Sequence, residues 1–94
     1  MAELDPVIHQ ATRLRVVALL HRNRVASFVD VQAALGLTSG NLDSHVAKLE
    51  EAGYVERWSE LTAGGFQVHL RITERGAAAF QSYLVALRDL LGER

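Results

Sequence analysis

Two helical segments in the middle of the sequence are joined by a Gly-Leu-Thr turn. The first segment is expected to span 27–35 and to end at Gly36, a residue that suits the left-handed backbone of a helix C-cap. Thr38 is expected to cap the second segment, which spans 38–52. Its apolar residues recur at the spacing of one helix face: Leu42, Val46 and Leu49. Only this short turn separates the two predicted helices.

The apolar residues change to a period of two after Gly53. Between Phe66 and Thr73 apolar and polar residues alternate, as in a half-buried strand, and 54–61 is its natural partner across a turn at 62–65. The predicted hairpin therefore spans 54–73. One register pairs opposite charges on the outer face and apolar residues on the inner face. It places these residues opposite each other: Val55 and Ile72, Glu56 and Arg71, Trp58 and His69, Leu61 and Phe66.

Helices are predicted at both ends of this unit. Asp5 is a good N-cap and is followed by a proline that suits the first helical position, so the first helix is expected over 5–22. Thr73 is expected to cap a last helix over 74–91, whose apolar residues follow one stripe. The order helix, helix, turn, helix, hairpin, helix predicts a mainly helical α+β fold in a single domain over 1–94.

The composition limits the class of protein. The 94 residues suit one domain, and the absence of cysteine excludes disulfides, thiol catalysis and Cys-ligated metal sites. The N-terminus lacks the basic residues of a signal peptide. The longest apolar run, Val16 to Leu20, is far shorter than the ~20 residues of a membrane span, so a cytoplasmic location is expected. A formal net charge of −1 argues against a protein that coats nucleic acid indiscriminately.

A short helix, a tight turn, a second helix and a two-stranded ribbon make a winged helix-turn-helix arrangement. At these residues the sequence resembles the small winged helix regulators of the MarR/ArsR type. The resemblance rests on Leu-Gly-Leu-Thr at 35–38, on Leu-Glu-Glu-Ala-Gly-Tyr-Val at 49–55 and on the junction after the hairpin at 71–76. It covers nearly the whole chain. It implies a homodimeric, sequence-specific transcription regulator of prokaryotes that binds double-stranded DNA.

The helix at 38–52 is the expected recognition helix. Such a helix enters the major groove with its N-terminal residues at the base edges. Asparagine can pair with adenine, serine with several bases and lysine with guanine or phosphate, while free N–H groups at a helix N-terminus suit a phosphate. The expected contacts of this helix are Thr38, Ser39, Gly40, Asn41, Ser44, His45 and Lys48. Any exposed helix face has a similar composition, so the turn and the hairpin are what favour DNA.

The charges depart from those of similar regulators. The recognition helix has an acid at Asp43 and carries one lysine against three acids, and the hairpin tip, 60–67, has no base. The cations of the hairpin, Arg57 and Arg71, are nearer its root, and Arg71 is expected to face Glu56. The wing therefore offers less positive charge to DNA than the resemblance implies.

Positive charge is concentrated instead between residues 6 and 29, where four arginines occur without an acid. Two of them, Arg22 and Arg24, are expected to hold phosphates together with the arginines of the hairpin. The alternative is that these arginines only solvate the first helix or pair with acids of a partner chain.

The first and last helices are apolar over more than one face. One side of each is expected to build the core, and the remainder would be exposed on a single chain, where a large apolar patch usually marks an interface. In the similar regulators the terminal helices form a two-fold dimer. The residues expected at a homodimer interface are Val16, Leu19, Leu20, Tyr83, Leu87, Leu90 and Leu91.

No cofactor, metal or enzymatic activity is expected. The four histidines share no short ligand spacing, and no nucleophile can be matched with a base. An effector would have to lie at a subunit interface, and nothing in the sequence identifies one. Trp58 is expected on the outer face of the hairpin, covered by neighbouring side chains, with packing on a partner chain or stacking on DNA as alternatives.

A second class of function stays open from the sequence. A winged helix that has lost its basic wing can serve as a protein-interaction or dimerisation module with weak or no DNA binding. The near-neutral charge and Asp43 favour this class. Salt dependence separates the two, because binding that neutralises phosphates must weaken steeply as ionic strength rises.

Overall fold

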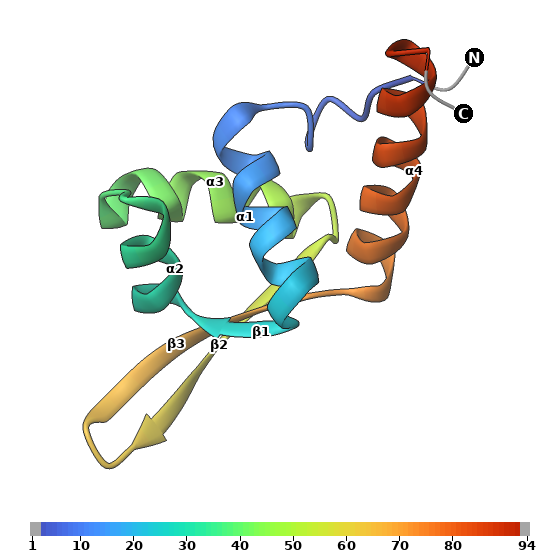
Figure 1. Ribbon diagram of the computed structural model, residues 1–94. Helices are drawn as coiled ribbons and strands as arrows, with labels where there is room; N and C mark the ends of the chain where they lie inside the picture. Colours follow the sequence, from blue (N-terminus) through green and yellow to red (C-terminus); the bar gives the residue numbers. More distant parts are fainter. Residues whose placement is uncertain (1–2, 93–94) are drawn as a thin grey trace.

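In the computed structural model, which describes residues 3–92, a helical body carries a hairpin that extends away from it (Figure 1). The fold is a mainly helical α+β winged helix, as predicted, and the hairpin and the last three helices lie within one residue of their expected bounds. The elements in chain order are α1 (Ala11–Asn23), β1 (Val25–Ser27), α2 (Phe28–Leu35), α3 (Ser39–Glu51), β2 (Val55–Thr62), β3 (Gly65–Ile72) and α4 (Glu74–Leu90).

The first helix is the exception, because α1 begins at Ala11 and not at Asp5. Asp5 does cap a turn, since its Oδ1 accepts a hydrogen bond from the backbone N–H of Val7 at 2.8 Å. The chain then becomes extended at Gln10 (φ −142°, ψ 130°), whose side chain caps α1 by accepting from the N–H of Arg13 at 2.8 Å. The expected helix over 5–22 is therefore an isolated turn followed by a shorter helix.

The turn between α2 and α3 forms as predicted. The Ser27 hydroxyl caps α2 by accepting from the N–H of Asp30 at 3.0 Å, and Gly36 ends that helix in the left-handed conformation (φ 66°, ψ 38°). The Thr38 hydroxyl then caps α3 by accepting from the N–H of Asn41 at 3.1 Å. These caps fix where α2 ends and where α3 starts.

The three strands form an antiparallel sheet in the order β1-β3-β2. The predicted hairpin register is confirmed: Val55 lies opposite Ile72, Glu56 opposite Arg71, Trp58 opposite His69, and Leu61 opposite Phe66. Strand β1 is not among the predicted elements; it pairs with the other edge of β3 and places Val25 opposite Arg71. The central strand β3 therefore joins the wing to the segment that leads directly into α2.

The apolar core surrounds α1, which packs against α2, α3, α4 and β3. Because α1 is surrounded in this way, nearly all of its apolar surface is buried within a single chain. The expectation that four residues of α1 and α4 would be exposed on a single chain is therefore wrong. The residues concerned, all buried, are Val16, Leu19, Leu20 and Tyr83. Of the expected interface, Leu87 is half-buried, and Leu90 and Leu91 are exposed at the end of α4.

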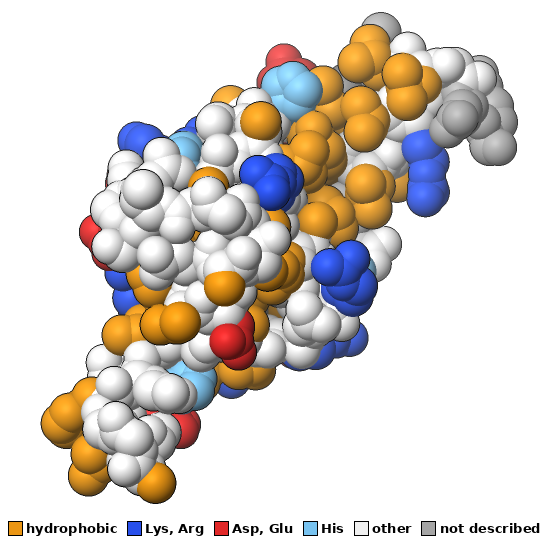
Figure 2. Space-filling view, turned by 60° about the vertical axis from the view of Figure 1, so that its left-hand side comes forward, with side chains coloured by type: hydrophobic (Ala, Val, Ile, Leu, Met, Phe, Trp, Pro, Cys, Tyr) orange, Lys and Arg blue, Asp and Glu red, His pale blue; other side chains and the backbone are white. Residues whose placement is uncertain are grey.

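The inner face of the wing is buried only near its root. Val55 and Ile72 belong to the core, whereas Leu61 and Phe66 at the tip are 73% and 77% exposed. Figure 2 shows two separate regions of apolar surface. One is a band of hydrophobic side chains that runs toward the C-terminal end of α4, and the other is the group at the tip of the wing. None of the helices between residues 3 and 92 is long and apolar enough to cross a membrane.

Candidate nucleic-acid interface

One face of α3 is built into the core and the opposite face is open. The residues that fix this orientation, all fully buried, are Leu42, Val46 and Leu49. The exposed residues of the expected contact surface are Thr38, Ser39, Gly40, Asn41, Ser44 and Lys48. Within residues 3–92, no hydrogen bond or ion pair engages the side chains of Ser39, Asn41, Ser44 or Lys48. Their polar atoms are therefore available to a ligand.

His45 lies at the border between this open face and α1. Its ring is half-buried, and Arg13 Nη1 lies 3.2 Å from its Nδ1. The same guanidinium donates from Nε to the carbonyl of Val7 at 2.6 Å, so it also fastens the N-terminal segment. Burial lowers the pKa of His45 below its usual range, and the positive charges of Arg13 and Lys48 lower it further. The ring is thus kept neutral, with Nδ1 as a hydrogen-bond acceptor.

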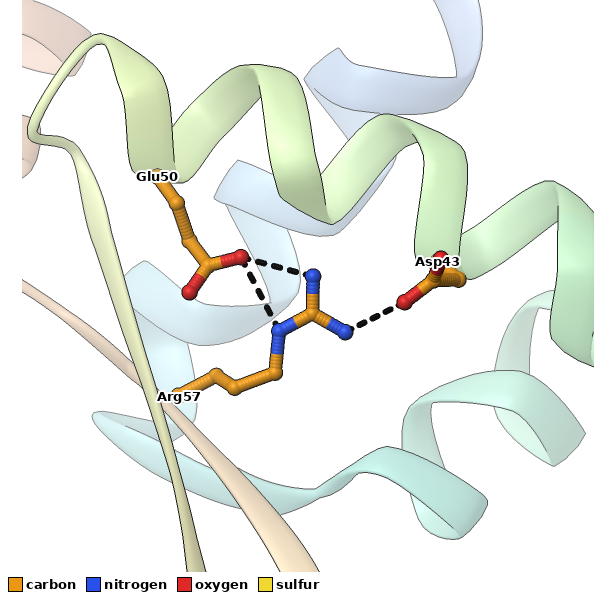
Figure 3. A network of polar contacts seen from close by, with 3 residues as sticks. All are labelled: Asp43, Glu50 and Arg57. Atoms are coloured by element: carbon orange, nitrogen blue, oxygen red, sulfur yellow. Dashed lines mark hydrogen bonds and ion pairs between the residues drawn. The ribbon is translucent and has the colours of Figure 1, made fainter.

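Arg57 links the wing to α3 on the other side of the helix (Figure 3). From β2 its guanidinium donates to Glu50 Oε1 through Nε at 2.9 Å and through Nη2 at 2.6 Å, while Nη1 donates to Asp43 Oδ1 at 2.5 Å. The hydrogen bonds to Glu50 raise the pKa of Arg57 above its usual range, and the hydrogen bond to Asp43 acts in the same direction. Arg57 was expected to hold a phosphate, but in this arrangement it neutralises acids of α3.

No spacing rule connects Asp43 with Arg57, because the two residues lie on different elements. From the sequence, the acid of the predicted recognition helix is therefore expected to disfavour DNA binding and the arginine to contact a phosphate. The structure pairs them instead. The negative charges of Asp43 and Glu50 on α3 are therefore partly neutralised by Arg57, where the wing meets the helix.

Arg71 is also engaged by an acid. It pairs with Glu56 across the hairpin, as expected from the register, and its guanidinium lies over the Trp58 ring at 5.8 Å from the ring centroid. Trp58 stacks on His69 with ring centroids 5.5 Å apart and donates from Nε1 to Glu60 at 3.1 Å. Trp58 is half-buried against these neighbouring side chains of the wing.

Arg22 and Arg24 are exposed at the end of α1, and no ion pair engages either side chain in the part of the chain that the structure describes. Arg24 has a positive φ of 72°, an uncommon conformation for a residue with a side chain, and its carbonyl accepts a hydrogen bond from Ile72 at 3.3 Å. These two cations thus directly precede β1 and have no carboxylate partner in the described residues.

Comparison with known proteins identifies the family of this chain. Residues 12–91 match the sequence profile described as a winged helix DNA-binding domain. The chain belongs to this winged helix DNA-binding family. An uncharacterised protein of Methanocaldococcus jannaschii is 32% identical over 84 residues, which cover 89% of this chain and 91% of that protein. The winged helix chain is thus a DNA-binding domain of a family without enzymatic activity.

Solved structures extend the comparison. A transcriptional regulator homologue from Pyrococcus horikoshii is 30% identical, with a TM-score of 0.87 over 92% of this chain and 85% of that one. A cysteine-to-serine variant of MarR from E. coli, in complex with operator DNA, is 23% identical with a TM-score of 0.73. This likeness covers 94% of this winged helix chain and 63% of the MarR chain, and it concerns the fold alone. The chain resembles transcriptional regulators, including those of the MarR family.

Proposed function

We propose that this winged helix protein is a homodimeric transcription regulator that binds a specific double-stranded DNA sequence with α3 in the major groove. The observation that carries the proposal is the open polar face of α3. Its serine, asparagine and lysine side chains have no partner within residues 3–92, whereas the neighbouring acids are held by Arg57. A helix with this face can approach DNA without presenting uncompensated carboxylates at the wing side.

The similarity to the MarR structure supports the same placement. That protein was solved in complex with operator DNA, and its fold matches 94% of this chain. In helix-turn-helix proteins generally, the second helix lies in the major groove with its N-terminal residues at the base edges. The exposed phosphate-binding candidates outside α3 are then Arg22 and Arg24, because Arg57 and Arg71 already have carboxylate partners.

The dimer rests on the apolar end of α4. Leu90 and Leu91 are 64% and 65% exposed, and Val85 on the same helix is 52% exposed. Apolar surface of this kind is costly in water and usually marks an interface. A two-fold dimer through this surface would present two α3 helices to half-sites about one DNA turn apart.

Selection of binding sites from a random DNA pool, followed by titration at several salt concentrations, tests the proposal. We expect one recurring site, with affinity that falls steeply as salt rises. Lys48→Ala should weaken binding about tenfold and reduce the salt slope by about one, since one phosphate or base contact is lost. Asn41→Ala should relax the preference at one base pair. The matched control is Arg75→Ala, which removes an exposed cation at the start of α4, away from the apolar end of that helix, and should change neither quantity.

Suppose that Lys48→Ala and Asn41→Ala each leave affinity, salt slope and base preference unchanged. In that case α3 is not the recognition helix. A second candidate function would then gain support, a protein-interaction module that binds DNA weakly or not at all. The observation in its favour is the wing tip, where Leu61 and Phe66 are exposed and residues 60–67 include no base. Binding to all sequences that is weak and insensitive to salt would favour this module.

A further inference from the structure

Asp43 is an acid on the helix that faces DNA in the proposed function. Its side chain lies in the second turn of α3 and is 62% exposed. A carboxylate directed toward a phosphate backbone is repelled, so its presence on this helix calls for a chemical reason. The ion pair with Arg57 reduces that repulsion while it leaves the side chain open to solvent.

The neighbours of Asp43 leave it accessible. The residues three positions before and four positions after it on the same helix face are Gly40 and Ala47, both exposed. A Cβ added at Gly40 would meet no atom within 4 Å, so the space beside it is empty. Only a glycine and a methyl group flank Asp43 at these two positions, and neither covers its carboxylate.

The Asp43 carboxylate is held in one orientation. Arg57 Nη1 donates to Oδ1 at 2.5 Å, and Arg57 is itself held by two hydrogen bonds to Glu50 Oε1 at 2.9 and 2.6 Å (Figure 3). No residue between 3 and 92 donates a hydrogen bond to Oδ2. One oxygen is therefore fixed to the wing, and the second can still accept a hydrogen bond.

We propose that Asp43 reads a cytosine in the major groove by accepting a hydrogen bond from the cytosine N4 amino group, and that Arg57 is the positioning residue for this contact. An ionised carboxylate only accepts hydrogen bonds. Cytosine presents only the N4 donor in the major groove. Thymine presents O4, guanine presents O6 and N7, and adenine places the acceptor N7 beside its N6 donor, so each of these three bases presents an acceptor that repels a carboxylate. The inference rests on the proposed function, because it requires α3 to lie in the major groove.

Site selection on the original protein and on Asp43→Asn tests the inference. We expect the original protein to require cytosine at one position and Asp43→Asn to lose that requirement, since an amide can also donate to thymine or adenine. A single unfavourable base pair usually changes affinity by roughly five- to 150-fold, and this preference should fall to nearly none. The matched control is Glu51→Gln, which removes the same charge from an exposed position of the same helix. It should raise affinity for all sequences equally and keep the cytosine preference.

Arg57 is tested with two further variants. Arg57→Gln should weaken the cytosine preference while Asp43 is still present, and Arg57→Lys should restore part of it, because an ammonium can replace one donor. A purely structural role for Arg57 would change thermal stability but not the base preference. Asp43→Ala serves as a second variant, so that the conclusion does not depend on how an asparagine is accommodated.

The outcomes separate the two proposals. A selected site in which Asp43→Asn and Asp43→Ala keep every base preference overturns the cytosine contact and leaves the regulator intact. A selected site with no required cytosine also overturns the contact. If the original protein selects no site at all, the proposed function fails and the contact fails with it.

Discussion

Gly76 at the start of α4 lies directly against the backbone of Tyr54. A Cβ added at Gly76 would lie 2.2 Å from the Tyr54 carbonyl oxygen and 2.9 Å from its carbonyl carbon. The same oxygen accepts a hydrogen bond from the N–H of Thr73 at 3.0 Å, and the Thr73 hydroxyl caps α4 by accepting from the N–H of Gly76 at 2.9 Å. The junction of α3, the wing and α4 therefore depends on a residue without a side chain.

Gly76→Ala should destabilise the protein by roughly 2–4 kcal/mol, because the methyl group must push the Tyr54 carbonyl away and break its hydrogen bond to Thr73. Urea unfolding monitored by circular dichroism measures the effect. Gly40→Ala is the matched control, since it adds the same methyl group to a helix position with nothing within 4 Å. It should stabilise α3 by about 0.5–1 kcal/mol. Equal effects of the two substitutions would show that the Tyr54 contact is unimportant.

The lowered pKa of His45 makes stability depend on pH. The unfolded chain binds a proton at this histidine near its usual pKa of 6.5, and the folded chain binds it only at a lower pH. The contribution is therefore complete above pH 6.5. It is lost as the pH falls through the interval down to the folded-state pKa. His45→Gln should reduce the loss of unfolding free energy between about pH 7.5 and about pH 5.

Ser44→Ala provides the control for His45, because it changes the neighbouring exposed residue without removing a titratable group. Its unfolding free energy should follow the same pH dependence as that of the original protein. A His45→Gln variant with an unchanged pH dependence would contradict the assignment.

Arg57→Gln should lower the unfolding free energy by roughly 1–2 kcal/mol, because it removes charge-assisted hydrogen bonds that fasten the wing to α3. It should also weaken DNA binding, since Asp43 and Glu50 lose their counter-charge. The salt slope should change far less than with Lys48→Ala, because Arg57 is neutralised by carboxylates and not by phosphates. A decrease of the salt slope by about one would instead assign Arg57 to a phosphate.

Leu90→Glu should convert a dimer into monomers, because a charge replaces an apolar side chain on the exposed end of α4. Sedimentation velocity at several protein concentrations measures the oligomeric state. Leu61→Glu is the control, as it makes the same change at another exposed leucine, on the wing tip. A protein that is monomeric before substitution, or a dimer that survives Leu90→Glu, would reject α4 as the interface.

Local signals in the sequence were sufficient for the helix-turn-helix unit and the wing. Ser27, Gly36 and Thr38 act as caps through hydrogen bonds to residues at most three or four positions away, and alternation fixes the register of the hairpin. The start of α1 could not be found in this way. Asp5 and its proline do cap a turn. Whether a helix continues beyond that turn depends on the backbone conformation of Gln10 and on the packing of the core.

Longer-range features were not accessible from the sequence. Strand β1 has only three residues and exists because β3 pairs with it, so it shows no periodicity of its own. The burial of Leu19 and Tyr83 depends on how many elements surround α1. The Asp43–Arg57 pair joins a helix to a strand, and it alters the expected role of both residues.

The direct passage from β1 into α2 has a mechanical consequence. Ser27 is both the last residue of β1 and the N-cap of α2, so no loop separates the sheet from the helix-turn-helix unit. β3 hydrogen-bonds to β1 on one side and to β2 on the other. A force that tilts the wing is therefore transmitted through β1 to α2, because no flexible loop lies between them to absorb the movement. If α3 lies in the major groove as proposed, a duplex that bends against the wing changes the angle at which α3 meets the bases, so binding then depends on DNA stiffness as well as on base identity.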